Sequence, residues 1–261
     1  MSDPLRRLTD LPGVADAVEE ARQAADRLLG HRVLRRRGGE VSAESVLRGA
    51  RASAALEGEP VSLEALRAGE QPGPVTQGAL RVTGELAQLV DTWGKAPRQV
   101  LARLHVLAAA DAVPADELGR PRRGIEARDP LGLGAPPPPS VIAPRLDTLA
   151  ETLTTRSAAP AIVAAAIAHG ELLTLRPFGF GDGVVARAAE RLTLIARGLD
   201  PKALVAIEVG HESLAEEYAA ALRGFGEGTA EGVAGWIRHC AAAVEAGARE
   251  STAICEALLR G

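Results

Sequence analysis

The sequence predicts an all-α fold. Alanine, leucine, arginine and glutamate, which favour helix, dominate the chain, and apolar residues recur at helical spacing over most of its length. Signals for strands are nearly absent: the best short run is Leu204–Ile207, and Leu172–Leu175 is a weaker second. The chain has no internal repeat and no coiled-coil heptad. Its 261 residues, 46% of them hydrophobic, are enough to bury a large core in one or two domains.

An N-terminal helical part is expected in residues 1–74. The apolar spacing there predicts helices at 16–29 and at 43–56, the second ended by Gly58, and a short helix capped by Ser62 and ended by Gly69. The sequence Gln-Pro-Gly-Pro at 71–74 breaks the helical pattern. Residues 75–261 are therefore expected to form the main helical domain.

The main domain has a regular series of helical patterns. They predict helices at 75–93, 98–110, 141–154, 160–175, 183–196, 213–222 and 228–250, the last extended toward Leu259, with one more turn at Asp116–Glu117. Between them, Gly119–Pro139 is expected to be a long exposed segment without helix, because it ends in two glycines and a run of prolines. Loops of this length are usually functional or disordered. Its arginines at 120, 122, 123 and 128 fit either a solvated face or a docking site.

Composition and charge exclude several classes of protein. The net charge of −4 argues against a general binder of nucleic acid or of membrane surfaces. The longest apolar stretch, 158–175, contains Pro160, His169 and Glu171, which predicts a buried helix instead of a membrane span. Cys240 and Cys255 form no metal or redox motif, so no metal site is expected. Two cysteines without such a motif fit a reducing compartment, so a cytoplasmic protein is expected.

The most informative stretch is Arg176–Arg187, which reads Arg-Pro-Phe-Gly-Phe-Gly-Asp-Gly-Val-Val-Ala-Arg. Three glycines at alternate positions precede a helical pattern, and such glycines let backbone N–H groups approach an anion. The stretch nevertheless has no histidine, lysine, serine, threonine or glutamate. Its charged groups are Arg176, Asp182 and Arg187, so it has the shape of a phosphate-binding loop with little of the usual chemistry.

This stretch resembles the signature of the Fic (Fido) family, His-x-Phe-x-Asp/Glu-Gly-Asn-Gly-Arg-x-x-Arg. The surroundings agree: Ala164–Leu175 resembles the helix before the Fic loop, Val100–Ala108 an earlier Leu-His helix, and the segment from Gly119 the flap of that family. Upstream, Ser53-Ala-Ala-Leu-Glu57-Gly58 is similar to its inhibitory motif, Ser/Thr-x-x-x-Glu-Gly/Asn. The resemblance covers residues 45–245 and implies an all-α Fic-like bundle with a flap and an N-terminal helical part packed on it.

The resemblance implies a transferase of AMP or a related group, whose loop holds a base, a magnesium ligand and phosphates. Four signature residues are retained, namely Phe178, Gly181, Gly183 and Arg187. Four others are replaced: Arg176 stands for the histidine base, Phe180 for the magnesium acid, Asp182 for the asparagine and Val184 for the first arginine. The anion-binding candidates are accordingly Arg176, Gly181, Gly183 and Arg187.

Each replacement has a physical consequence. Arginine stays protonated at neutral pH, so Arg176 cannot act as a base, and loss of a general base typically costs roughly 10²–10⁴-fold in rate. Phe180 offers magnesium no oxygen ligand. Asp182 suits the helix N-terminus as an N-cap but repels an incoming phosphate. We therefore expect ordinary adenylyl transfer to be lost and no metal to bind.

Other side chains in this region have more than one interpretation. Arg176 could hold a phosphate or carboxylate, or pair with an acid such as Glu171 or Asp182. His105 and His169 are expected to be hydrogen-bonded core histidines. The inhibitory-motif candidates are Ser53, Glu57 and Gly58, and we expect Glu57 to form a partly buried ion pair with Arg187.

Three functions remain open. The first is a Fic-fold pseudoenzyme that binds a partner protein or a small anionic ligand. The second is a nucleotide-dependent transferase with rewired chemistry, and the sequence leaves open whether ATP or another nucleotide binds. The third is an NAD(P)-dependent oxidoreductase, because Gly-Phe-Gly-Asp-Gly superficially resembles a dinucleotide fingerprint, although Val184 replaces its third glycine. The sequence also leaves open whether the chain forms a homo-oligomer. Neither nucleic acid nor a membrane is expected as a partner.

Overall fold

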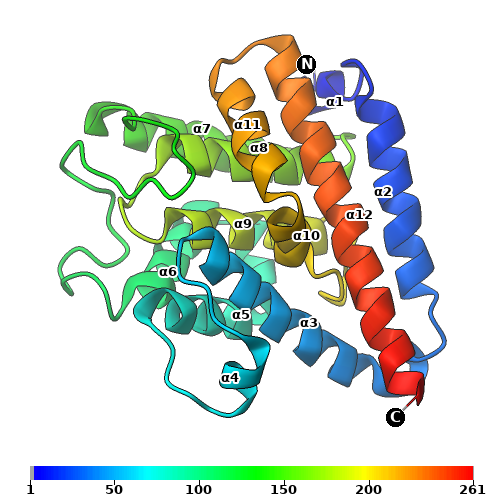
Figure 1. Cartoon of the computed structure of the whole chain (residues 1–261). Coiled ribbons are helices and arrows are strands. Elements are labelled where there is room, and N and C mark those ends of the chain that lie inside the picture. The colour runs from blue at the N-terminus through cyan, green and yellow to red at the C-terminus, as the bar shows by residue number, and fades with distance from the viewer. Residues whose placement is uncertain (1–2, 261) are drawn as a thin grey trace.

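The computed structural model describes residues 3–260, and its regular structure in that range is helical throughout. The helices in chain order are α1 (Pro4–Leu8), α2 (Val14–Leu29), α3 (Leu34–Leu56), α4 (Leu63–Arg67), α5 (Pro74–Trp93), α6 (Pro97–Ala109), the 3-10 turn η1 (Pro139–Val141), α7 (Ile142–Thr154), α8 (Ala161–Leu175), α9 (Asp182–Ala196), α10 (Ile207–Ser213), α11 (Ala215–Gly226) and α12 (Ala230–Arg260) (Figure 1). The predicted all-α class is confirmed.

Most predicted helices are present, and the differences have local causes. Helix α3 begins at Leu34, well before the predicted start, because it continues through a kink at Arg37 next to two glycines. Ser62 caps α4 as predicted, since its hydroxyl accepts a hydrogen bond from the Ala65 N–H. The apolar run Leu204–Ile207, the best strand signal, leads into α10 instead, and Asp116–Glu117 lies in a turn without helix. Leu172–Leu175, the weaker strand signal, is the last turn of α8.

Helix α9 lies in the middle of the bundle and packs against α8, α5, α6 and α3 (Figure 1). Nearly its whole length is buried, including Arg187, Glu190 and Arg191. Alanines on α8 and α9 keep these helices close, which is how a chain with only 2% aromatic residues fills its core. At the far side, α2 packs along α12, so N-terminal helices share the core with C-terminal ones (Figure 1). The division at residue 74 stays a prediction.

The segment between α6 and η1, residues 110–138, has no helix and is called the flap below. It is fixed to the bundle by backbone hydrogen bonds: the Arg122 N–H donates to the Pro177 carbonyl at 2.8 Å, and the Arg128 N–H to the Gly179 carbonyl at 2.8 Å. The predicted non-helical character of Gly119–Pro139 is confirmed up to the turn η1. The flap therefore lies over the loop that precedes α9.

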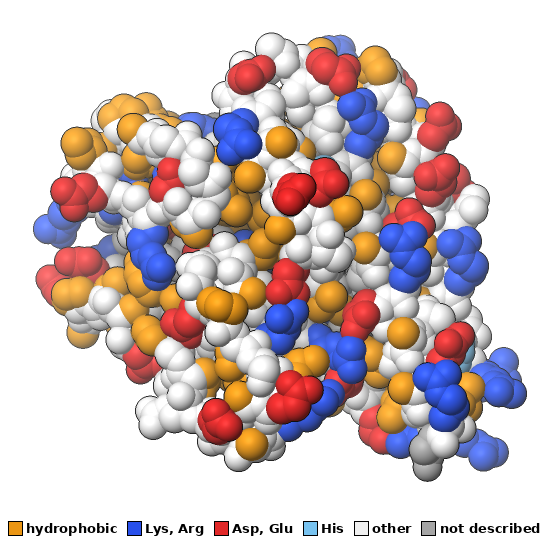
Figure 2. Space-filling view, in the orientation of Figure 1, with side chains coloured by type: hydrophobic (Ala, Val, Ile, Leu, Met, Phe, Trp, Pro, Cys, Tyr) orange, Lys and Arg blue, Asp and Glu red, His pale blue; other side chains and the backbone are white. Residues whose placement is uncertain are grey.

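Two properties of the surface and the helices concern the environment of the chain. On the face drawn in Figure 2, basic and acidic side chains are interspersed and neither sign of charge dominates. Within residues 3–260, none of the helices combines the length and apolar character that crossing a membrane requires.

Candidate functional site

Residues Arg176–Gly183, called the glycine loop below, connect α8 to α9 under the flap. Gly179 and Gly181 have φ of +83° and +68°, which glycine adopts without strain. Arg176 has φ of +45°, an unusual value for a residue with a side chain, and such a conformation costs about 1–2 kcal/mol. The loop thus keeps the tight shape predicted from its glycines.

The Asp182 carboxylate accepts the backbone N–H groups of its own loop. One carboxylate oxygen accepts from the Phe178 N–H at 2.9 Å, and the other accepts from the Gly179 N–H at 2.7 Å. The predicted N-cap role is wrong, because Gly181 occupies the N-cap position and Asp182, the first residue of α9, reaches back into the loop. Burial raises the pKa of Asp182 to about 7. Two N–H donors that an anion could use are therefore already occupied by a carboxylate.

Arg187 is buried in a cluster with Ser53 and Glu57, called the Arg187 cluster below. Its Nη2 donates to Glu57 Oε1 at 2.9 Å and to the Ser53 carbonyl at 3.0 Å, and its Nε donates to Ser53 Oγ at 2.9 Å. The ion pair expected from the sequence is present, with both side chains at most 4% exposed. Gly58, which follows Glu57 with φ of +84°, ends α3.

The Glu57 carboxylate also lies directly against the first turn of α9. A Cβ placed on Gly183 would meet Glu57 Oε1 at 1.8 Å, so only glycine fits at that position while the Arg187 cluster is intact. The cavity between Glu57, Asp182, Gly183 and Arg176 measures about 10 Å³, which is space for a single water molecule. No space for a phosphate is left at the α9 N-terminus in this conformation.

Arg176 is buried and contacts the flap. Its Nη2 donates to the Gly134 carbonyl at 2.6 Å, and its Nη1 lies 3.4 Å from Asp129 Oδ1, an ion pair without an aligned hydrogen bond. Neither acid expected from the sequence is its partner, because Asp182 accepts from the loop backbone and Glu171 pairs with Arg145 at 2.6 Å. Arg176 therefore joins the glycine loop to the flap.

The remaining replaced positions offer no ligand for a metal. The Phe180 ring lies under the guanidinium of Arg128, whose carbon is 5.1 Å from the ring centroid. Val184 is buried in the apolar core. Since magnesium needs oxygen ligands, and the neighbouring N–H donors are occupied, these residues do not fit a magnesium–nucleotide group.

The two histidines interpreted as core residues are buried and hydrogen-bonded. His105 Nδ1 accepts from the Gly119 N–H at 2.9 Å, and the ring stacks on Phe178 with centroids 4.2 Å apart. Burial lowers the pKa of His105 to about 4. His169 Nε2 lies 2.7 Å from the Tyr218 hydroxyl, and burial lowers the pKa of His169 to about 4 as well. Both rings are therefore neutral at physiological pH and closed to solvent.

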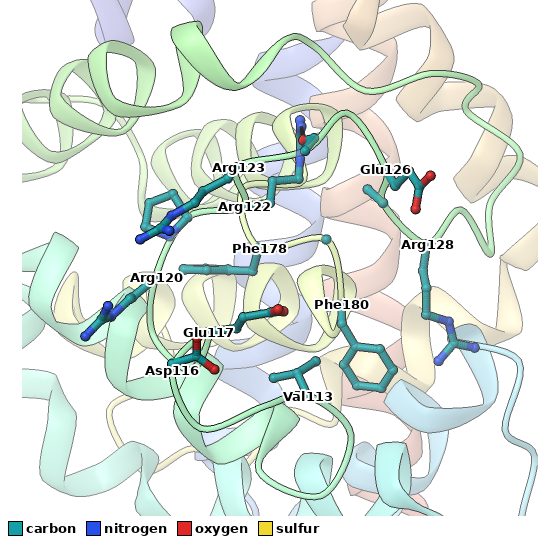
Figure 3. Close-up of a pocket in the computed structure, with 14 residues that line it drawn as sticks. Val113, Asp116, Glu117, Arg120, Arg122, Arg123, Glu126, Arg128, Phe178 and Phe180 are labelled. Carbon is teal, nitrogen blue, oxygen red and sulfur yellow. Dashed lines mark hydrogen bonds between the residues drawn. The ribbon is translucent and has the colours of Figure 1, made fainter.

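An open groove of about 610 Å³ lies on the other side of the glycine loop (Figure 3). We call it the outer groove; its labelled lining residues are Val113, Asp116, Glu117, Arg120, Arg122, Arg123, Glu126, Arg128, Phe178 and Phe180. Figure 3 shows the two phenylalanines of the glycine loop between arginines of the flap. Arg122 has a structural role, since its guanidinium donates to the carbonyls of Arg176, Gly124 and Pro137.

Sequence reasoning missed Asp129 and Tyr218. Asp129 accepts the backbone N–H groups of Leu133 and Gly134 and holds the flap turn that reaches Arg176. The Tyr218 hydroxyl lies 3.4 Å from Arg187 Nη1. No local pattern marks their roles in the site, because Asp129 meets Arg176, and Tyr218 meets Arg187, only in the folded chain.

This arrangement is that of the Fic fold: a helical bundle with a glycine loop before its central helix and a flap over that loop. Solved structures agree. A Fic family protein from Desulfovibrio desulfuricans G20 is 20% identical, with a TM-score of 0.75 over 93% of this chain and 75% of that one. Fic-1 from C. elegans (residues 134–508) is 19% identical, with a TM-score of 0.72 over 94% and 73%.

A Fic domain containing signaling protein from Bacteroides thetaiotaomicron is 13% identical, with a TM-score of 0.63 over 92% of this chain and 98% of that one. No protein-family model matches the sequence, and no curated protein matches it. At these identities the likeness shows the fold. It also removes the basis for a dinucleotide-binding oxidoreductase, because that fold needs a parallel sheet and residues 3–260 form no strand.

Proposed function

We propose that this chain is a divergent relative of Fic proteins that no longer transfers adenylyl groups and acts by binding. The observation that carries the proposal is the Asp182 carboxylate on the Phe178 and Gly179 N–H groups. A phosphate at the start of α9 would have to displace this carboxylate and would also meet Glu57 against Gly183. Two carboxyl groups therefore stand where an anionic substrate would need donors.

The proposed binding surface is the outer groove, and the proposed occupant is a segment of a partner protein. Arg120 and Arg123 are exposed, and no hydrogen bond or ion pair within residues 3–260 engages their guanidinium groups. Acidic residues of the flap line the same groove. Charges of both signs beside the rings of Phe178 and Phe180 suit a peptide better than a small free anion.

The catalytic half of the proposal is tested by transfer of label from α-labelled ATP with magnesium. The samples are the wild type, Glu57→Gly, and Glu57→Gly combined with Arg176→His, Phe180→Glu, Asp182→Asn and Val184→Arg, which rebuilds the loop of the resembled signature. Circular dichroism verifies that each variant is folded. We expect no label on the chain or on added protein with the first two samples. Label with Glu57→Gly alone would overturn the proposal and favour a rewired transferase, whereas label with the rebuilt loop alone supports it.

The binding half is tested on the groove. Proteins captured from cells that produce this chain are compared between the wild type and Arg120→Glu combined with Arg123→Glu, with Arg103→Glu on α6 as a surface control. We expect one captured protein to be lost with the groove variant and kept with the control. Equal capture by all three would exclude the outer groove as the binding surface.

A further inference from the structure

Four side chains with metal-binding atoms meet in the core of the bundle, each from a different helix. They are His169 on α8, Glu190 on α9, His211 on α10 and Cys240 on α12, called the buried ligand cluster below. Their ligand atoms all lie within 4.8 Å of one another, and all four residues are buried. Helix bundles build metal sites in this way, from facing helices that are far apart in sequence.

The Glu190 carboxylate lacks the partners that other buried acids have. Among residues 3–260 the buried glutamates are Glu57, Glu190 and Glu208, and the first and last pair with Arg187 and Arg191. The buried aspartates, Asp182 and Asp200, accept backbone N–H groups instead. Glu190 Oε2 instead contacts two imidazole nitrogens, His211 Nε2 at 2.8 Å and His169 Nδ1 at 2.7 Å.

One of these contacts is not a hydrogen bond. His169 Nδ1 is completely buried and lies 2.7 Å from Glu190 Oε2, but the contact lacks the geometry of a hydrogen bond, and Nδ1 has no other partner within residues 3–260. A buried ring nitrogen without a hydrogen-bond partner is costly. Its lone pair would be satisfied by a cation located between the four side chains.

The other nitrogen of each histidine already has an outer partner. His169 Nε2 contacts the Tyr218 hydroxyl at 2.7 Å, and His211 Nδ1 contacts His239 Nε2 at 3.1 Å. Histidines that bind metals almost always donate their second N–H to such a partner, which fixes the tautomer and the ring orientation. Close packing of α10 on α12 holds His211 in place, since a Cβ on Gly210 would lie 2.0 Å from the Ala243 carbonyl.

From this geometry we infer that the buried ligand cluster is a structural site for a divalent transition metal of the zinc type. His169 Nδ1, His211 Nε2, Glu190 Oε2 and Cys240 Sγ supply the two nitrogens, one oxygen and one sulfur of a tetrahedral set. Ligand atoms around zinc are separated by about 3.3–3.8 Å, so the two imidazole–carboxylate contacts widen by roughly 1 Å or less on binding.

Charge and protons balance in this site. The Cys240 thiol loses one proton to solvent, and its thiolate and the Glu190 carboxylate together neutralise the 2+ charge of the cation. Each histidine carries its proton on the outer nitrogen, so His169 donates to Tyr218 and His211 donates to His239. Because the cluster is closed to solvent, the metal enters during folding. The inference of a metal site does not depend on the function proposed above.

The test uses the full chain produced in zinc-supplemented medium, freed of loosely bound metal, and assayed for zinc by mass spectrometry. Chain refolded with Co²⁺ is examined for the thiolate-to-cobalt charge-transfer band. The variants are Cys240→Ser and His239→Ala, and the matched control is Cys255→Ser, a second buried thiol on α12 outside the cluster. We expect stoichiometric zinc and a cobalt–thiolate band in the wild type and the control.

Removal of Cys240 should abolish the charge-transfer band, and His239→Ala should lower zinc affinity ~10–100-fold. If Cys240→Ser fails to fold, the wild type and Cys255→Ser still decide the question. A folded wild type that contains no zinc and gives no cobalt–thiolate band overturns the inference. The cluster would then be a core network of hydrogen bonds.

Discussion

Replacing Glu57 with alanine should destabilise the protein more than replacing any exposed acid. Arg187 is completely buried, and Glu57 is the carboxylate that pairs with it at 2.9 Å. Removal of one partner of a buried ion pair leaves an uncompensated charge and costs about 3–5 kcal/mol. At roughly 2–4 °C per kcal/mol for a domain of this size, the midpoint of thermal unfolding should fall by about 6–20 °C.

Matched variants separate the charge from other effects. Glu85→Ala removes one partner of the exposed pair between Glu85 and Arg103, which is worth about 0–1 kcal/mol. Glu57→Gln should cost less than Glu57→Ala, since its amide oxygen still accepts from Arg187. The double change Glu57→Leu with Arg187→Met should cost less than Glu57→Ala, because no unpaired charge remains. Unfolding is followed by circular dichroism, and a loss for Glu57→Ala no larger than that for Glu85→Ala would refute the reasoning.

Three further predictions follow from the loop and the flap. Gly183→Ala should lower the unfolding midpoint, because the added Cβ meets Glu57 Oε1 at 1.8 Å; an unchanged midpoint would show that Glu57 moves freely. Burial raises the pKa of Asp182 from 3.8 to about 7, so between these two pH values the folded state binds more protons at this carboxyl group than the unfolded state does. The free energy of unfolding should therefore fall as the pH rises from 3.8 to about 7, by at most ~4 kcal/mol. Urea titrations from pH 4 to pH 8 should show this slope in the wild type and not in Asp182→Asn; equal slopes would contradict it. Arg122→Met should release the flap, because it removes the hydrogen bonds of the guanidinium to four backbone carbonyls, and hydrogen exchange of residues 110–138 should rise; equal exchange in Arg122→Met and in Arg123→Met would refute this role.

The helical class and the order of the main helices could be predicted from the sequence because apolar spacing and glycine or proline breaks are local signals. The glycine loop was found for the same reason, since its three glycines precede a helix. The pairing of Glu57 with Arg187 required the resemblance to the Fic family, because 130 residues separate the two in the chain. What the sequence could predict therefore depended on how local the signal was.

The other contacts of the site could not be predicted because they depend on tertiary placement. Asp182 was expected to cap α9, and only the path of the loop shows that its carboxylate accepts from Phe178 and Gly179. Arg176 was expected to pair with Glu171 or Asp182, but the folded flap brings Asp129 to it instead. Cys240 has no metal-binding spacing in the sequence, and the fold alone brings it to two histidines and a glutamate.

The central claim is that Asp182 occupies the loop donors, so that removing the glutamate of the Arg187 cluster does not by itself create a nucleotide site. Calorimetric titration of ATP with magnesium into folded Glu57→Gly tests this claim most directly. The account predicts no saturable heat for Glu57→Gly or for the wild type. Saturable, magnesium-dependent binding of ATP to Glu57→Gly, with Asp182 unchanged, would contradict it.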